Sequence, residues 1–131
     1  MKARTTYLGL LSLAILFPSC EGNTDRIRQI RNNTSGLIQV VANGMYIPDY
    51  NASISTGQTE SLFVSHQRGG SSYVESPSMG ITDMTITNAS GDTCLKEFTL
   101  PGNWEINLEE RKKTPSDWQH EYTFIVNEND F

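Results

Sequence analysis

The chain has 131 residues and a formal net charge of −5, from 15 acidic and 10 basic residues. This length suits a single domain of ordinary size. No basic stripe with interleaved aromatic residues follows the first 20 residues, so nucleic acid is excluded as an expected partner. The acidic balance favours solubility and mild repulsion from anionic surfaces.

The first 20 residues have the pattern of an export signal. Lys2 and Arg4 give a positive start, residues 7–17 are almost wholly apolar, and Cys20 follows two residues after Pro18. A positive end stays on the cytoplasmic side while the apolar run enters the export channel. The run is shorter than the roughly 20 apolar residues of a spanning helix, and it lacks the polar face of a core helix. We therefore predict a signal peptide over residues 1–19.

The end of this segment, Phe17-Pro18-Ser19-Cys20, resembles the lipobox of bacterial lipoproteins. In that family a small residue precedes a cysteine that receives a diacylglycerol group. The resemblance implies cleavage before Cys20, a lipid on that cysteine and anchoring in the cell envelope. Phe17 and Pro18 depart from the usual pattern of Leu followed by Ala or Ser. Looser boxes ending in Ser-Cys resemble those of Bacteroidota lipoproteins, which implies the outer membrane, with periplasmic or surface display left open.

The two cysteines of the chain, Cys20 and Cys94, allow two interpretations. If Cys20 is acylated, Cys94 has no partner and is expected to be a buried, small apolar residue. The alternative is ordinary secretion with a Cys20–Cys94 disulfide in an oxidising compartment. The lipoprotein is favoured because the cysteine falls where the signal should be cut.

The rest of the chain divides into a short tether and one β domain. Residues 20–25 are predicted to be the lipidated cysteine and a polar tether, and residues 26–131 the domain. Extended runs separated by turn residues predict strands over residues 26–31, 37–41, 61–65, 82–88, 93–100, 104–109 and 118–126. Seven or eight such strands predict an all-β fold, an antiparallel β-sandwich, with a small barrel as the alternative. The layout resembles small Bacteroidota lipoproteins with one Ig-like domain.

The clearest alternation lies in the last third of the sequence. Large apolar or aromatic side chains and one histidine occupy alternate positions of two runs: Trp104, Ile106 and Leu108, then Trp118, His120, Tyr122, Phe124 and Val126. Such alternation places one set of side chains inward. We expect the aromatic members to be substantially buried, and the polar segment 110–117 to be a loop.

The sequence predicts no catalytic residue, metal ligand or cofactor. His66 and His120 are far apart, and spaced metal-ligand motifs are missing. We expect His120 to be a core histidine and His66 a solvated one. Cys94 lies in a predicted strand without an adjacent base, and no Gly-x-Ser-x-Gly elbow occurs.

Loop aromatics are the remaining candidates for a binding site. Tyr46, Tyr50 and Tyr73 lie in predicted loops marked by proline or glycine, and Arg68 precedes two glycines. Tyrosine and arginine are enriched at interfaces, and loops on a rigid scaffold carry recognition. The alternative is that these tyrosines cover the open ends of the core.

These observations favour a lipid-anchored, non-enzymatic binding module for a protein or glycan ligand. One alternative is a periplasmic inhibitor or immunity-type lipoprotein with a single protein partner. A small hydrolase assembled from distant residues is the third hypothesis.

Overall fold

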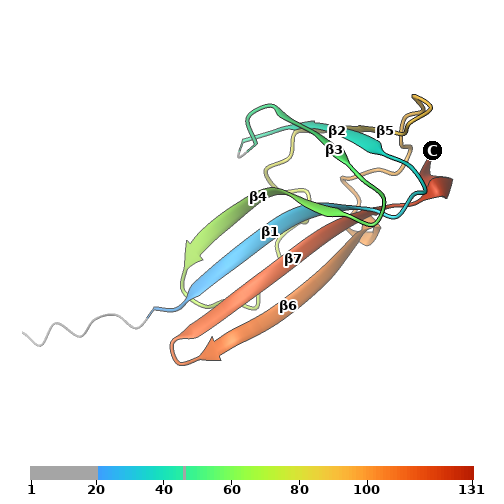
Figure 1. The fold of residues 1–131 in the computed structure, drawn as a ribbon. Helices are drawn as coiled ribbons and strands as arrows, with labels where there is room; N and C mark the ends of the chain where they lie inside the picture. The colour runs from blue at the N-terminus through green and yellow to red at the C-terminus, as the bar shows by residue number, and fades with distance from the viewer. Residues whose placement is uncertain (1–20, 46) are drawn as a thin grey trace, which may run out of the picture.

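The computed structural model describes residues 21–45 and 47–131, which form seven strands in two sheets (Figure 1). The strands are β1 (Asn23–Asn32), β2 (Ile38–Asn43), β3 (Tyr50–Ile54), β4 (Thr59–Arg68), β5 (Asp83–Thr87), β6 (Trp104–Lys113) and β7 (Ser116–Val126). Two short 3-10 helices, η1 (Pro101–Asn103) and η2 (Glu128–Asp130), complete the described chain. The prediction of a β-sandwich is confirmed. None of the described segments is a helix long and apolar enough to cross a bilayer.

The larger sheet has the order β4-β1-β7-β6 and the smaller one β3-β2-β5. Neighbouring strands are antiparallel except β1 and β7, which run parallel with Arg28 beside Tyr122. A parallel pair requires a long crossover, and here the crossover is almost the whole domain. The first and last strands therefore lie side by side at the centre of the larger sheet. We call the end where both of them begin the entry end.

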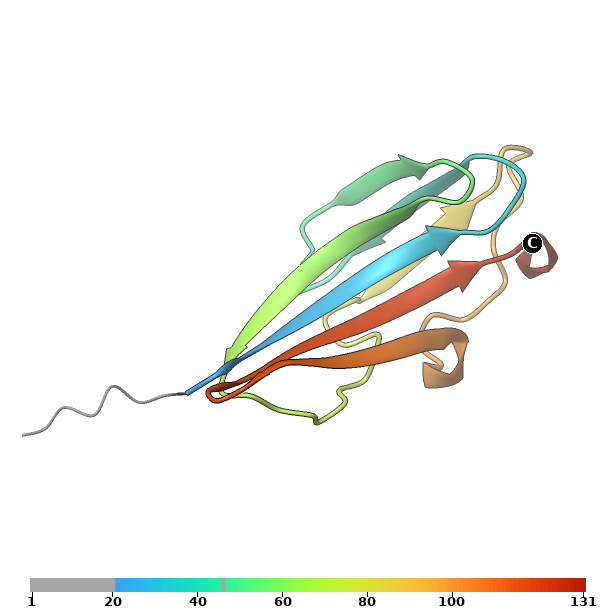
Figure 2. The ribbon, with the colours of Figure 1, turned by 60° about the horizontal axis from the view of Figure 1, so that its bottom comes forward.

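The two sheets differ in length, and this difference creates two environments (Figure 2). Strands of the larger sheet have 10 or 11 residues, whereas those of the smaller sheet have 5 or 6. The half of the larger sheet that faces the smaller one holds the apolar core, with Ile30, Phe124 and Val126 fully buried. The half toward the entry end is crossed instead by residues 69–82, which we call the strap.

Several core predictions are confirmed, and the exceptions lie on exposed parts of the sheet. Trp104, Tyr122 and Phe124 are buried, and the rings of Trp104 and Phe124 lie 5.2 Å apart. Trp118 is only half-buried. Ile106 is 38% exposed because β6 is an edge strand whose cover ends near its first residue.

One predicted strand does not form, and one strand of the structure was not predicted; both differences have local reasons. Residues 93–100 form no strand beyond a single bridge between Thr87 and Thr93. Part of this backbone forms hydrogen bonds with the C-terminal segment instead of with a neighbouring strand, since Leu95 N donates to the carbonyl oxygen of Asp130 at 2.6 Å. Conversely, β3 was not predicted, because its sequence Tyr-Asn-Ala-Ser-Ile is largely polar, which suits an edge strand but gives little signal.

The predicted tether and the predicted loop 110–117 are both shorter in the structure. β1 begins at Asn23, where the backbone N–H donates to Oδ1 of Asp117 at 2.8 Å. Thr24 is fully buried, so residues 23–25 belong to the sheet and not to a tether. β6 and β7 extend until only Thr114 and Pro115 remain between them. Polar side chains fit strands there because this hairpin reaches past the smaller sheet (Figure 1).

Candidate functional site

The inner face of the larger sheet is polar and charged toward the entry end. Alternation along β1 turns Thr24, Arg26 and Arg28 inward, on the same face as Ile30. In the parallel register, Arg26 lies beside His120 and Arg28 beside Tyr122. All five of these polar side chains are buried. The sequence carried a signal for this cluster, because Arg26 and Arg28 share the parity of Ile30, but it was not recognised.

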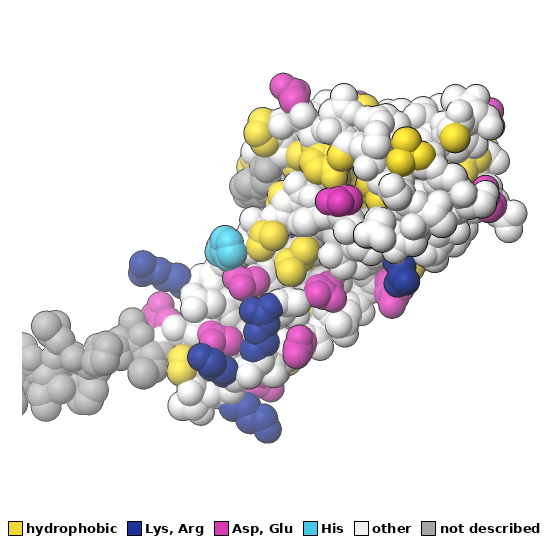
Figure 3. All heavy atoms as spheres, viewed as in Figure 1, with side chains coloured by type: hydrophobic (Ala, Val, Ile, Leu, Met, Phe, Trp, Pro, Cys, Tyr) yellow, Lys and Arg dark blue, Asp and Glu magenta, His cyan; other side chains and the backbone are white. Residues whose placement is uncertain are grey.

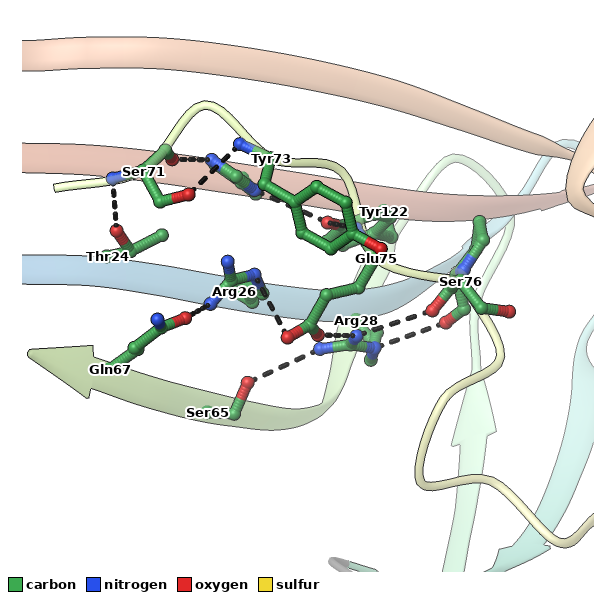
Figure 4. A network of polar contacts seen from close by, with 12 residues as sticks. Thr24, Arg26, Arg28, Ser65, Gln67, Ser71, Tyr73, Glu75, Ser76 and Tyr122 are labelled. Atoms are coloured by element: carbon green, nitrogen blue, oxygen red, sulfur yellow. Dashed lines mark hydrogen bonds and ion pairs between the residues drawn. The ribbon is translucent and has the colours of Figure 1, made fainter. Parts of the chain in front are cut away.

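Arg28 is the most extensively held side chain of the cluster (Figure 4). Its Nη2 donates to Oε2 of Glu75 at 2.9 Å, and its Nε donates to the carbonyl oxygen of Pro77 at 3.1 Å. The guanidinium also lies 4.8 Å from the centroid of the Tyr122 ring and 5.2 Å from that of Phe63. Stacking and charge-assisted bonds together fix the orientation of this cation.

Arg26 shares the same carboxylate. Its Nε lies 3.5 Å from Oε1 of Glu75 and has no hydrogen-bond partner among the described residues, whereas Nη1 donates to Oε1 of Gln67 at 2.6 Å. Two buried guanidiniums therefore face one carboxylate, whose side chain keeps 21% of its surface exposed. A buried charge without a partner costs free energy of folding. The pairing with Glu75 is therefore important for the stability of this half of the domain.

A chain of hydrogen bonds links His120 to the strap. The N–H of Glu75 donates to the hydroxyl oxygen of Tyr122 at 3.3 Å, and that oxygen lies 3.3 Å from Nδ1 of His120. Nε2 of His120 lies 2.7 Å from the carbonyl oxygen of Ser71. Burial lowers the pKa of His120; the bond to Ser71 opposes this, and the positive charge of Arg26 adds to it. Burial and the neighbouring guanidinium of Arg26 therefore both favour the neutral form of the imidazole.

The strap covers this cluster through polar contacts. Thr24 Oγ1 donates to the carbonyl oxygen of Gly69 at 2.7 Å and accepts the N–H of Ser71 at 2.9 Å. Tyr73 is 71% exposed, and Val74 is also exposed. The apolar side chains in this part of the strap thus face solvent, and polar groups hold it to the sheet.

The structure places the predicted binding residues in different settings. Cys20 and Tyr46 lie outside the described residues. Arg68 ends β4 as an exposed residue, and Tyr73 lies on the strap. Tyr50, predicted to lie in a loop, instead begins β3 and packs half-buried against the core, where burial, and secondarily Glu60, raises its pKa. Of the four predicted binding residues, the strap therefore contains Tyr73, and Arg68 directly precedes it at the end of β4.

The other chemistry-bearing side chains lie apart from this cluster. His66 is exposed on β4, and its Nδ1 lies 2.6 Å from Oδ1 of Asp25, whose other carboxylate oxygen, Oδ2, lies 3.8 Å from Nη1 of Arg111. Cys94 is free and half-buried outside any strand, and burial raises the pKa of its thiol. In the described part of the chain, no group of three or more His, Cys, Asp or Glu residues is arranged to hold a metal ion.

Two other surface regions offer less specific chemistry. A hollow of about 460 Å³ lies far from the entry end, lined by Leu95, Lys96, Glu97, Leu100, Asn103, Asn129 and Asp130. Its lysine is engaged in the wall, since Lys96 Nζ donates to the carbonyl oxygen of Ile125 at 2.7 Å. At the entry end, exposed Arg68, Arg111 and Lys112 are interleaved with acidic side chains (Figure 3). Such mixed charge is typical of a solvated tip.

Comparison of the chain with protein families, curated proteins and solved structures gave no match.

Proposed function

We propose that the mature protein is a lipid-anchored, non-enzymatic binding module of the cell envelope, held to the outer membrane through Cys20. The supporting observation is the position of β1, which begins at Asn23. Extended chain from residue 20 to residue 23 spans at most about 11 Å. A lipid on Cys20 would hold the entry end close to the membrane surface and leave the flank with the strap open to a partner.

The environments of the histidines support binding over catalysis. His120 is fully buried, and both of its ring nitrogens have partners within the domain. His66 is exposed, but its recorded partner is Asp25, and no serine or cysteine of the described chain is hydrogen-bonded to it. A nucleophile activated by a general base needs that contact. The proposal therefore assigns no catalytic residue.

The strap is the surface that we propose for recognition. It is a segment without regular strands that displays Tyr73 beside a rigid sheet, and exposed aromatic side chains on loops are frequent anchors of interfaces. The ligand is a protein or a glycan. Capture of one protein in a fixed ratio would favour the inhibitor or immunity-type alternative.

Lipid labelling tests the anchor. Labelled palmitate should enter the wild-type protein and the Cys94→Ala control, whereas Cys20→Ala should be unlabelled and leave the membrane fraction. Label retained by Cys20→Ala would contradict the anchor.

Partner capture from native membranes tests the recognition surface. Tyr73→Ala should reduce capture without lowering the melting temperature, because this side chain is mostly exposed. Leu95→Ala is the matched control, since Leu95 is 79% exposed but lies at the distant hollow. Equal capture by both variants would exclude the strap as the recognition surface.

A further inference from the structure

We propose that Arg26 and Arg28 form a carboxylate-binding site that Glu75 of the strap occupies in the free protein. The ligand class is a carboxylate group carried by the partner, and the strap is its displaceable cover. This inference rests on the proposed function, since it names the chemistry that a binding module would recognise.

The distribution of charge between sheet and strap is the first argument. The sheet contributes two buried guanidiniums, and the strap contributes the one carboxylate of the described residues that contacts both of them. His120 adds no charge in its neutral form. One guanidinium nitrogen, Arg26 Nε, is buried without a hydrogen bond among the described residues. The sheet surface is thus built for an anion and has spare capacity when Glu75 is bound.

The second argument is that the sheet itself holds both arginines in place. Arg28 is stacked between Tyr122 of β7 and Phe63 of β4, and Nη1 of Arg28 lies 3.4 Å from the Ser65 hydroxyl oxygen. Arg26 is bonded to Gln67 of β4. These contacts would remain if the strap moved away, so the binding geometry is preorganised.

The third argument concerns the cover. From Gly69 to Glu75 the strap is held to this half of the sheet by hydrogen bonds and ion pairs, and Tyr73 and Val74 are exposed, whereas the buried apolar residues of the strap, Pro77 and Ile81, come after Glu75 (Figure 4 shows the strap over β7). An external carboxylate in place of Glu75 would take over its hydrogen bond with Arg28 Nη2, which is 2.9 Å long, and its ion pair with Arg26 Nε at 3.5 Å. Glu75 competes from within the same molecule, so a free carboxylate binds the wild-type protein only weakly.

The experiment removes this internal competitor. Glu75→Ala is compared with Glu60→Ala, which deletes an exposed glutamate of β4. Melting temperatures and the NMR signals of arginine Nε–H groups are followed in acetate and in chloride at equal ionic strength. We expect Glu75→Ala to melt at a lower temperature in chloride, and acetate to restore more than half of that loss with saturable arginine shifts. Glu60→Ala should respond equally to both salts.

Two ligands then distinguish the source of the carboxylate. N-acetylglutamate amide represents a carboxylate on a protein, and glucuronate represents a carboxylate on a glycan. In the wild-type protein, a saturating amount of the better ligand should accelerate hydrogen exchange of the amides of residues 71–76, because the strap is displaced. An ion pair with a purely structural role predicts no such acceleration.

The proposal would be overturned if acetate and chloride had the same effect on Glu75→Ala. It would also be overturned if the ligand left the hydrogen exchange of the strap amides in the wild type unchanged. If Glu75→Ala does not fold, Glu75→Gln keeps the shape of the side chain without its charge. It should bind acetate at least about tenfold more tightly than the wild type. Failure of these tests would leave the results for Cys20 labelling and for partner capture unaffected.

Discussion

The hydroxyl oxygen of Tyr122 lies 3.3 Å from Nδ1 of His120, while the opposite ring nitrogen faces the carbonyl oxygen of Ser71 at 2.7 Å. A carbonyl oxygen only accepts, so Nε2 carries the hydrogen and Nδ1 accepts the hydrogen of Tyr122. Protonation of Nδ1 would deprive the Tyr122 hydroxyl hydrogen of this acceptor. It would also place a third cation near Arg26 and Arg28, and in the described part of the chain Glu75 is the one carboxylate that pairs with both arginines.

The first prediction is a loss of stability in mild acid. Burial lowers the pKa of His120 in the folded state, with smaller opposing and reinforcing effects from Ser71 and Arg26, whereas the unfolded value is about 6.5. At a pH between the folded and the unfolded pKa of His120, the unfolded chain therefore binds more protons than the folded chain. The contribution of His120 is complete above about pH 6.5 and is lost as pH falls toward the folded pKa, by at most about 1.4 kcal/mol per pH unit.

Urea unfolding between pH 7.5 and 5 measures this effect. The free energy of unfolding should depend less steeply on pH in His120→Gln than in the wild type. In His66→Gln, which changes the exposed histidine of β4, this pH dependence should be the same as in the wild type. Identical slopes in the wild type and His120→Gln would contradict the assignment.

The second prediction concerns the buried guanidinium of Arg28. Arg28→Ala removes the closest cation from Glu75 and also the stacking on Tyr122, so it should lower the free energy of unfolding by about 3 kcal/mol. Arg31→Ala, at an exposed position of the same strand, should change it by less than about 0.5 kcal/mol. The midpoints of urea denaturation measure both, and similar values for the two variants would count against a buried Arg28.

The third prediction compares Phe124 with Ile106. The alternation in the sequence predicts that both side chains point inward. Phe124→Ala should cost about 3–5 kcal/mol, because Phe124 is fully buried and contacts Trp104. Ile106→Ala should cost only about 1 kcal/mol, since Ile106 remains 38% exposed. Equal losses in urea denaturation would mean that β6 is covered in solution.

The fourth prediction concerns the close approach of the chain at the entry end. A Cβ atom on Gly22 would lie 1.6 Å from the carbonyl oxygen of Ser116, so the backbone must shift. Gly22→Ala should therefore lower stability by about 1–3 kcal/mol. Gly102→Ala is the control, because a Cβ atom there meets no heavy atom within 4 Å. Calorimetric melting that is unchanged in Gly22→Ala would show that β1 begins later than Asn23.

The sequence by itself determined the period-2 alternation, the sandwich class and the burial of Trp104, His120, Tyr122 and Phe124. These properties are local, since successive side chains of a strand point to opposite faces whatever the neighbouring strands are. The signal peptide and the lipid on Cys20 also derive from local sequence, and they remain predictions.

Only the tertiary structure decided which parts of each inward face are covered. Ile106 has the inward parity but lies beyond the cover, while Arg26 and Arg28 have it and are buried. Their partner Glu75 is distant in sequence, on a segment without a repeating pattern. Whether a side chain loses contact with water depends on the segment that packs over it, and that segment comes from a distant part of the chain. The strap and the charged cluster beneath it were therefore absent from the sequence-based predictions.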